Sequence, residues 1–309
     1  MRAEPHRLHP RSQSEHPFRT EKTIKLSPGA VSYLQAAPLL LVLIAFFGIP
    51  LLMIVTVSFF EFDGISSVPA FQLANYTDLF SSPVTLTLYW KTIQYALMVW
   101  AITLVIGFTV SYFLAFHVRS LLWQMALFLV CTVPFWTSNI IRMISWIPFL
   151  GRNGIFNQAL MGAGVTSEPL EFLLFSDFAV VIAYVHLFTL FMIVPIFNSM
   201  ARIDRSIIEA ALDGGSSGWR IIWEIVVPLS KTGIALGSIF VITLVMGDFF
   251  VVNTMSGGHS ASVALAMYNQ IAAVQYPPAA ASAVILLIIV VLMVAAILRL
   301  VDVRRELAG

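Results

Sequence analysis

Long runs without a charged residue constrain this chain more than any other feature. Of its 309 residues, 59% are hydrophobic and only 11% are charged, against about 25% charged in soluble domains. A helix that crosses the hydrocarbon core of a bilayer needs about 20 apolar residues. Charge-free runs of that length lie between Lys25 and Glu61, Lys91 and Arg119, Arg119 and Arg142, Asp177 and Arg202, and, with Asp248 inside it, Lys231 and Arg299. The sequence therefore predicts an all-α polytopic membrane protein.

These runs predict six transmembrane helices, and the basic residues predict their orientation. The spans are expected over residues 36–60, 92–117, 122–146, 178–200, 233–254 and 279–300. Lys and Arg collect on the cytoplasmic side of membrane proteins. With the N-terminus inside, all of the 17 Lys and Arg lie on that side except Lys91, Arg142 and Arg152. We therefore expect both termini to be cytoplasmic.

The chain is expected to divide into a short tail and one transmembrane domain. Residues 1–33 are polar, mildly basic and contain several prolines, which predicts a flexible cytoplasmic tail. No small-residue cleavage site follows a short apolar core, so this tail is not predicted to be a signal peptide. The transmembrane domain covers residues 34–309, with a charged cytoplasmic loop at 201–232. Pro134 predicts a kink in the third span.

Several classes of activity have no motif in this sequence. There is no G-x-x-x-x-G-K-[ST] phosphate loop, so we do not expect the chain to hydrolyse ATP. There is no H-E-x-x-H and no cluster of His and acids typical of a metal site. The single cysteine, Cys131, excludes an intrachain disulfide. We therefore expect no catalytic residue and no metal. We also expect no nucleic-acid partner, although the net charge of +1 carries no information on that point.

The charged loop carries the signals of two short helices. Ser206 and Glu209 have the spacing of a capping box, and Gly214-Gly215 predicts the end of that first helix. A second helix is expected to begin near Ser216-Ser217, because an apolar stripe follows with the helical period. The stripe consists of Trp219, Ile222, Trp223 and Val226, and Pro228 predicts a bend into the fifth span.

The loop resembles the EAA loop of the membrane subunits of ABC importers, the class fed by periplasmic binding proteins. That family's pattern is Glu-Ala-Ala, three residues, Gly, nine residues, Ile, one residue and Leu-Pro. This sequence departs from it only in having Val227 for the usual Leu. In the family the loop forms a coupling helix that docks in a groove of the ATPase. The resemblance implies this role for Glu209, Ala210, Ala211, Asp213, Gly215 and Pro228.

Two further stretches are similar to the spermidine/putrescine permease group of that family. One runs from Val133 to Ser138, continues through Ile141-Arg142 and ends with Leu150–Gly154 and Asn157. The other comprises Gly247-Asp248-Phe249 and Gly257-Gly258, although the intervening segment lacks the proline-bearing continuation typical of the group. The resemblance implies a polyamine cargo. Opines, amino-acid derivatives, phosphonates and iron chelates stay open as alternatives.

The resemblance also implies an assembly. It predicts a type I ABC importer transmembrane domain in a bacterial inner membrane, acting as a non-catalytic permease subunit. Its partners would be an ATPase dimer, a second homologous permease, a periplasmic solute-binding protein and the lipid bilayer. The polyamine group implies a heterodimer of permeases, and a homodimer stays open. ATP and Mg²⁺ would be used by the ATPase, so no cofactor is expected on this chain.

Four residues are candidates for the solute pathway. Asp248 is an acid inside a predicted span, where a charge costs about 2.5–3.5 kcal/mol on insertion scales, so it is expected to face a cavity or a partner. It would offset the charge of a polyamine, or serve only as a structural acid near the membrane surface. Trp136, Trp146 and Tyr184 could hold an ammonium group on their ring faces, and the alternative is the interfacial aromatic belt.

Two residues and two other function classes stay open. His186 fits helix packing or proton transfer, and Arg142 fits a helix anchor or a contact with a docked binding protein. A secondary transporter driven by ions would use Asp248 as its coupling acid, but it predicts inverted repeats that the sequence lacks, and it leaves the charged loop unexplained. An intramembrane enzyme would need a catalytic pair at membrane depth, and no such pair is evident.

Overall fold

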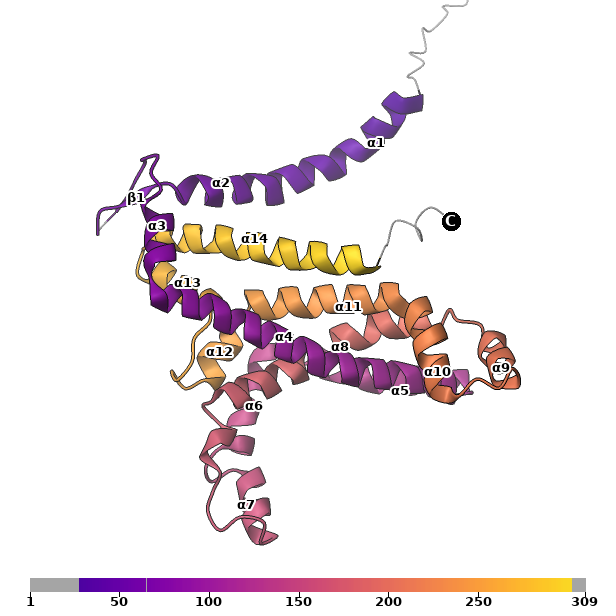
Figure 1. Cartoon of the computed structure of the whole chain (residues 1–309). Coiled ribbons are helices and arrows are strands. Elements are labelled where there is room, and N and C mark those ends of the chain that lie inside the picture. The colour runs from indigo at the N-terminus through magenta and orange to yellow at the C-terminus, as the bar shows by residue number, and fades with distance from the viewer. Residues whose placement is uncertain (1–27, 65, 302–309) are drawn as a thin grey trace, which may run out of the picture. The chain divides into compact units, whose positions relative to one another are not determined.

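The computed structural model describes residues 28–64 and 66–301, and nearly all of its regular structure is helical (Figure 1). Within those residues, five helical segments are long and apolar enough to cross a membrane, and a sixth span results if one bent pair is counted. The five segments are Gln35–Val57, Pro83–His117, Asp177–Met200, Gly218–Gly247 and Tyr276–Arg299. Predicted spans one, two, four, five and six each overlap one of them.

The first segment forms a unit by itself as far as Leu51. It contains α1 (Pro28–Leu43), a π-helical turn η1 (Ile44–Gly48) and the start of α2 (Ile49–Val57). The π-helical turn ends two residues before Pro50, whose nitrogen has no hydrogen to donate to the helical hydrogen-bond ladder. Residues 1–27 of the expected cytoplasmic tail lie outside the described residues, and helix begins at Pro28.

Short elements lead from the first span to the second. The strands β1 (Glu61–Phe62) and β2 (Ser67–Val68) pair antiparallel, and α3 (Ala74–Ser81) follows. Helix α4 (Pro83–Tyr112) then begins with Ser82 as its N-cap, accepting from the Thr85 N–H at 3.3 Å. It ends in a π-helical turn, η2 (Phe113–His117).

The second span begins nine residues earlier than the charge pattern predicts. Lys91 was expected to mark its start, but α4 runs through Lys91. The Lys91 ammonium lies 3.0 Å from the carboxylate of Asp177, which is the first residue of α8 (Asp177–Met200). This ion pair allows a charge inside the helix, because each charge is compensated by the other.

The third predicted span is not straight. Helix α5 (Leu121–Thr132) and the 3₁₀ turn η3 (Val133–Trp136) end at an extended break, and α6 (Asn139–Leu150) leaves at an angle of 89°. The expected kink at Pro134 is present, but a continuous helix over 122–146 is wrong. Thr137 adopts a β conformation, which interrupts the helical ladder just after the proline turn. Helix α7 (Ile155–Gly162) continues from α6, and the short turn η4 (Glu171–Leu173) precedes α8.

The remaining elements complete the bundle. The loop helices are α9 (Arg205–Asp213) and α10 (Gly218–Ile221), and the π-helical turn η5 (Ile222–Val226) leads into α11 (Val227–Gly247). Helices α12 (Phe250–Met255) and α13 (Val263–Ala272) precede the long α14 (Tyr276–Val301). Helices α4, α8 and α11 pack against one another, and α14 packs along α11 (Figure 1).

Glycines allow α8 to approach both of its main neighbours closely. A Cβ added at Gly107 of α4 would lie 2.6 Å from Met192 Cγ, and one added at Gly237 of α11 would lie 2.7 Å from Met192 Sδ. A Cβ at Gly233 would collide with the Pro195 carbonyl oxygen and with Ser199 Cβ. Small residues at helix contacts are the usual means by which membrane helices pack at short range.

Hydrogen bonds between side chains and neighbouring helices reinforce this packing. Ser111 of α4 donates to the Ile193 carbonyl of α8 at 3.0 Å, and the Trp100 indole of α4 donates to Ser238 of α11 at 2.8 Å. Tyr89 of α4 reaches the Ser282 carbonyl of α14 at 2.8 Å. The helices are thus held together both by close packing and by hydrogen bonds at specific residues.

The glycine contact yields a stability prediction. Gly233→Ala should destabilise the folded chain by about 1–3 kcal/mol, the usual cost of overpacking, because the new methyl group meets backbone atoms of α8 that cannot move aside. The thermal unfolding midpoint of the detergent-solubilised chain should fall by several degrees. Gly247→Ala is the matched control, since a Cβ there meets nothing within 4 Å. Equal midpoints for the two variants would contradict the close-packing account.

Candidate functional site

The start of α9 differs from the predicted capping box. The N-cap is Asp204, whose carboxylate accepts from the Ser206 N–H at 2.9 Å. This hydrogen bond also holds the pKa of the Asp204 carboxyl below its usual value. Ser206 therefore lies inside the first turn, and the expected exchange between Ser206 and Glu209 is wrong. The carboxylate two residues upstream caps the helix first, and Glu209 stays available for another role.

The end of α9 is the glycine cap that the sequence predicts. Gly215 has a φ of +78°, a conformation that residues with a Cβ rarely adopt. The Ser216 N–H bonds to the Ala211 carbonyl and the Gly215 N–H bonds to the Leu212 carbonyl, both at 2.9 Å. This is the hydrogen-bond pattern of a Schellman motif. Ser217 then caps α10, as expected, by accepting from the Arg220 N–H.

Helix α9 presents two different faces. Ile208 and Ala211 are half-buried and pack against the apolar core. Glu209, Ala210 and Asp213 are exposed on the other side. Among the described residues, no hydrogen bond or ion pair involves the Glu209 carboxylate. The resulting surface consists of a free carboxylate beside a small side chain, which a second protein could approach closely.

Arg205, the first residue of α9, ties this helix to the end of the second span. Its guanidinium donates to the carbonyls of Ala115 and Val118, at 2.9 and 3.0 Å. These carbonyls lie at the C-terminal end of the α4–η2 helix, where carbonyls lack helical partners and a positive charge is favourable. No sequence pattern indicates this contact, because the two accepting carbonyls lie about 90 residues from Arg205 and belong to the backbone.

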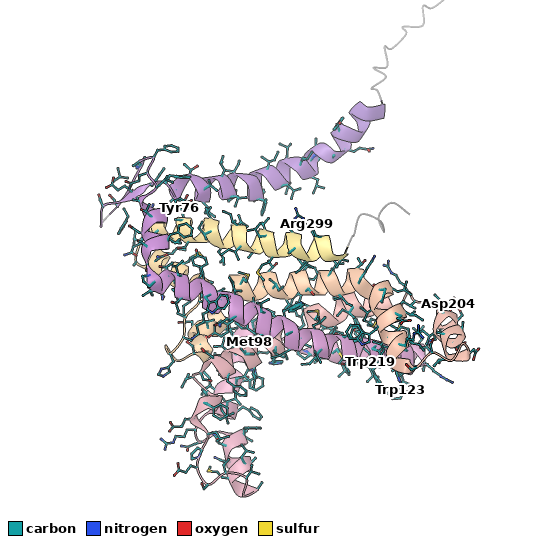
Figure 2. All side chains as sticks on the ribbon, in the orientation of Figure 1. Tyr76, Met98, Trp123, Asp204, Trp219 and Arg299 are labelled. Carbon is teal, nitrogen blue, oxygen red and sulfur yellow. The ribbon has the colours of Figure 1, made fainter. Side chains whose placement is uncertain are left out.

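The second loop helix continues into the fifth span without a break in the helix. Residues Gly218–Gly247 form one helical segment, with the π-helical turn η5 ending two residues before Pro228. In the predicted apolar stripe, Val226 is buried, whereas Trp219 and Trp223 are 70% and 54% exposed and meet edge to face. Figure 2 labels Asp204 and Trp219, which lie together at the α9–α10 end of the bundle. That end therefore offers both the carboxylate face of α9 and an aromatic pair.

Of the four pathway candidates, the structure brings Asp248 and Tyr184 together. Helix α11 ends at Gly247, so Asp248 lies in the break before α12, and the expectation that it is inside a helical span is wrong. The Tyr184 hydroxyl donates to the backbone carbonyl and to Oδ1 of Asp248, at 3.2 and 3.4 Å. The same carboxylate accepts from the Val251 N–H at 2.8 Å. Asp248 is thus a half-buried carboxylate held by two donors.

Trp136 and Trp146 lie apart from this pair. Trp136 is 77% exposed on η3. The Trp146 indole donates to Nδ1 of His186 at 3.1 Å, which joins α6 to α8. Neither tryptophan has a ring contact or hydrogen bond with Asp248 or Tyr184 in the part of the chain that the structure describes.

Sequence reasoning missed a row of aromatic rings that extends from Tyr184 along α8. Tyr184 stacks on Phe188 with ring centroids 5.6 Å apart, and Phe188 meets Phe191 at 6.2 Å. Phe191 in turn contacts Phe135 of η3 and Phe240 of α11, at 5.4 and 6.4 Å. The spacing of 184, 188 and 191, at i, i+4 and i+7, was the signal available in the sequence.

This row borders a hollow in the surface of the bundle. The hollow has a volume of about 680 Å³ and is lined by α8, α11 and the loop before α9. Phe240 lies at one part of its wall, and Arg202 and Asp204 lie at another. The hollow thus adjoins both the aromatic row and the start of the loop helix.

A second network lies on the other side of Tyr184. The Tyr95 hydroxyl donates to Asp177 Oδ1 at 2.6 Å and also bonds to Ser260, while Asp177 pairs with Lys91. Tyr95 meets Tyr184 edge to face. The two networks join α4, α8 and the segment after α12 at the end of the bundle opposite α9 (Figure 1).

Comparison with known families gives one match over most of the chain. Residues 107–306 match the family described as "Binding-protein-dependent transport system inner membrane component". The match starts in α4 and includes the whole charged loop.

Individual relatives agree with this match. The chain is 35% identical over 219 residues to the spermidine/putrescine transport system permease protein PotB of Escherichia coli K12, covering 70% of this chain and 77% of that protein. It is 33% identical over 217 residues to PotB of Haemophilus influenzae, covering 70% and 74%. The inner membrane ABC transporter permease protein YdcU of Escherichia coli K12 is 26% identical over 257 residues, covering 79% and 81%.

A solved structure shares the fold. A chain of a bacterial alginate ABC transporter, in complex with a periplasmic protein bound to an alginate pentasaccharide, superposes with a TM-score of 0.69. The likeness covers 86% of this chain and 92% of that one at 15% identity. It supports the helical architecture of a type I importer domain and carries no information on cargo.

The Arg205 contact can be tested apart from any activity. Arg205→Gln removes the charge that binds the η2 carbonyls, so the amide hydrogens of α9 should exchange with deuterium several-fold faster. Arg220→Gln is the matched control, because Arg220 pairs with Glu224 one turn along the next helix and does not reach η2. Unchanged exchange in α9 of the Arg205 variant would show that the contact does not hold the helix.

Proposed function

This chain belongs to the family of binding-protein-dependent transport system inner membrane components, and we propose that the cargo of its importer is a polyamine such as putrescine or spermidine. As a member of that family it is a permease subunit in the inner membrane, which its apolar helices cross several times. The observation that carries the cargo proposal is the likeness to the PotB permeases over more than two thirds of the chain. The PotB names refer to spermidine and putrescine, and no other cargo has comparable support.

The proposed topology has six spans with both termini in the cytoplasm. The bent pair α5–η3 and α6–α7 would supply the remaining span, since the two parts are long and apolar enough to cross a membrane when they are taken together. The distribution of Lys and Arg supports this orientation. A reporter enzyme that works only in the cytoplasm should be active when it is fused to the C-terminus. If only a reporter that works in the periplasm were active there, the topology would be reversed.

The proposed role of α9 is to dock into the ATPase. Its exposed face carries Glu209, Ala210 and Asp213, and the cap at Gly215 fixes where the helix stops. A docked helix would move with the ATPase when ATP binds, and Arg205 would carry that motion to η2 and α4. Packed membrane helices with two stable arrangements could then alternate the access of the hollow between the two sides. ATP and Mg²⁺ would act only on the ATPase subunits.

The importer is proposed to contain two permeases, two ATPase subunits and a periplasmic binding protein. The second permease would be a homologous but different chain, as in the polyamine group. The exposed face of α8 and α11, with Phe240 47% exposed and Leu236 46% exposed, is one surface on which such a subunit could pack. The hollow on that face would then lie between the two permeases.

The proposed solute path follows the aromatic row. A primary ammonium group on an aromatic face gains about 0.5–2 kcal/mol, depending on how far it is desolvated. Asp248 at the Tyr184 end supplies a negative charge, and Phe191 and Phe240 continue toward the hollow. A diamine could therefore exchange its hydration for a carboxylate and for successive ring faces.

The cargo proposal is tested by uptake of labelled putrescine and spermidine in cells that retain the partner genes. Deletion of this gene should abolish saturable uptake of at least one of them, and the wild-type gene should restore it. Equal uptake with and without the gene would refute the polyamine cargo. The permease assignment would be unaffected, and the opine and amino-acid alternatives would be tested in the same strains.

The role of Asp248 gives a separate prediction. Asp248→Asn retains an oxygen acceptor for Tyr184 and Val251 but removes the negative charge. We expect the KM for putrescine to rise about tenfold, equivalent to about 1.4 kcal/mol of lost attraction, while the ATPase still co-purifies. Phe128→Leu, in an aromatic pair with Phe197 away from the row, should leave the KM unchanged. An unaltered KM in Asp248→Asn would make this carboxylate purely structural.

A further inference from the structure

The break between α5 and α6 leaves the N-terminus of α6 uncapped. Ser138 occupies the N-cap position, but its side chain makes no hydrogen bond to the first turn. Arg142 is the first residue of α6 whose N–H reaches a carbonyl, that of Ser138 at 3.1 Å. The N–H groups of residues 139–141 therefore have no hydrogen-bond acceptor among the described residues. A twelve-residue helix with a free first turn presents partial positive charge there.

Arg142 adds a full positive charge at the same place. Its side chain folds back over the first turn, and Nη2 donates to the Thr137 carbonyl and to Asn139 Oδ1. The residue is only 8% exposed, and its Nε is buried without a hydrogen-bond acceptor. The ion pairs found among residues 28–64 and 66–301 do not include Arg142. Its charge is therefore buried and uncompensated within the described chain.

A hollow of about 270 Å³ adjoins this guanidinium. Its other walls are apolar side chains of η3 and α8, together with Cys131, His186 and Thr189, whose hydroxyl donates to the Val185 carbonyl. The His186 Nδ1 accepts from the Trp146 indole, so the neutral imidazole carries its proton on Nε2 and is a donor there. No Asp or Glu lines the hollow. The walls are thus mainly apolar, Arg142 supplies their positive charge, and His186 is a further hydrogen-bond donor.

Such a set of donors calls for an anion. A buried cation that has lost its hydration and has no partner costs several kcal/mol, and inside a membrane protein such residues pair or face a functional cavity. One guanidinium balances one negative charge, which matches a carboxylate better than a doubly charged phosphate. Guanidinium groups also bind carboxylates with two parallel hydrogen bonds.

We propose that the hollow at the α5–α6 break is a carboxylate-binding site formed by Arg142 and His186. The site goes beyond the proposed polyamine cargo, because putrescine and spermidine carry no carboxylate, and it rests on the importer function proposed above. The carboxylate has two sources: a cargo that combines amines with a carboxylate, or an acidic side chain of a neighbouring subunit. At the neighbouring break between α5 and α6, the exposed polar side chains of Thr137, Ser138 and Asn139 fit either source and do not fit lipid.

A matched pair of solutes separates the two sources. Ornithine is the same diamine as putrescine with one carboxylate added. Uptake of labelled putrescine by the whole importer is measured with unlabelled ornithine as competitor, in the wild type, Arg142→Gln and Arg152→Gln. Arg152 is the control, because it is 71% exposed in its side chain and lies 3.7 Å from Glu171.

If the carboxylate comes from the cargo, Arg142→Gln raises the inhibition constant of ornithine at least tenfold and changes the KM of putrescine less than twofold. If it comes from a neighbouring subunit, Arg142→Gln lowers the amount of partner subunits that co-purify with the tagged chain, and Arg142→Lys restores most of it. Wild-type behaviour of Arg142→Gln in both measurements would overturn the proposal.

The stability of the isolated full-length chain provides a third measurement. Arg142→Met removes the charge at similar volume, so the unfolding midpoint should stay the same or rise, as when other buried charges are replaced by apolar residues. A fall of several degrees would mean that the guanidinium serves the fold of this chain, and would contradict the site. If the wild type imports neither diamine, the polyamine proposal fails by itself, while co-purification and stability still decide the role of Arg142.

Discussion

The close contact of α8 with α4 and α11 is the constraint on which the other features depend. Met192 fills the space that Gly107 and Gly237 leave, and Gly233 lets the α11 backbone pass the Pro195 turn of α8. This contact fixes the direction in which α8 projects its remaining side chains. Tyr184, Phe188 and Phe191 consequently form one row, with Asp248 at one end and the hollow near α9 at the other. A polar or bulky side chain at the glycines would separate the helices and disperse the row.

The loop helix is coupled to this bundle by two kinds of contact. Its inner face packs through Ile208 and Ala211, and Arg205 binds the backbone at the end of the second span. Both contacts leave the Glu209 side of α9 exposed. A force applied to that side would reach α4 through the guanidinium and α11 through the continuous helix from Gly218. The geometry therefore suits an element that transmits movement without taking part in chemistry.

Features that depend on local chemistry were predictable from the sequence, and features that depend on distant partners were not. Charge-free runs predicted most spans, and Gly215 predicted the end of α9, because hydrophobic length and a left-handed cap are properties of a short segment. The cap at Asp204 was missed because Ser206 offers an equally good local pattern two residues later. Lys91 borders a charge-free run, so the sequence predicts the start of a span there. Its ion-pair partner, Asp177, lies 86 positions away, and the pairing is therefore not evident from the sequence. The sharp turn at residues 137–138 was not predictable, since Pro134 indicates a kink but not its angle. The contact of Arg205 with η2 and the missing acceptor of Arg142 Nε depend on residues brought together only by the fold.

The proposed coupling of this permease to ATP requires that α9 docks into an ATPase subunit, and a cross-link detects that docking. Cys131, the single cysteine of the chain, is replaced by Ser, and a cysteine is placed by Glu209→Cys in inner-membrane vesicles that contain the whole importer. A short maleimide–benzophenone attached to position 209 should insert into the ATPase subunit on illumination and join the two chains, with a yield that changes when ATP is added. Asp78→Cys on α3, at the other end of the bundle, should give no such product. Labelling of position 209 without any ATPase cross-link would contradict the docking of α9 and the coupling route derived from it.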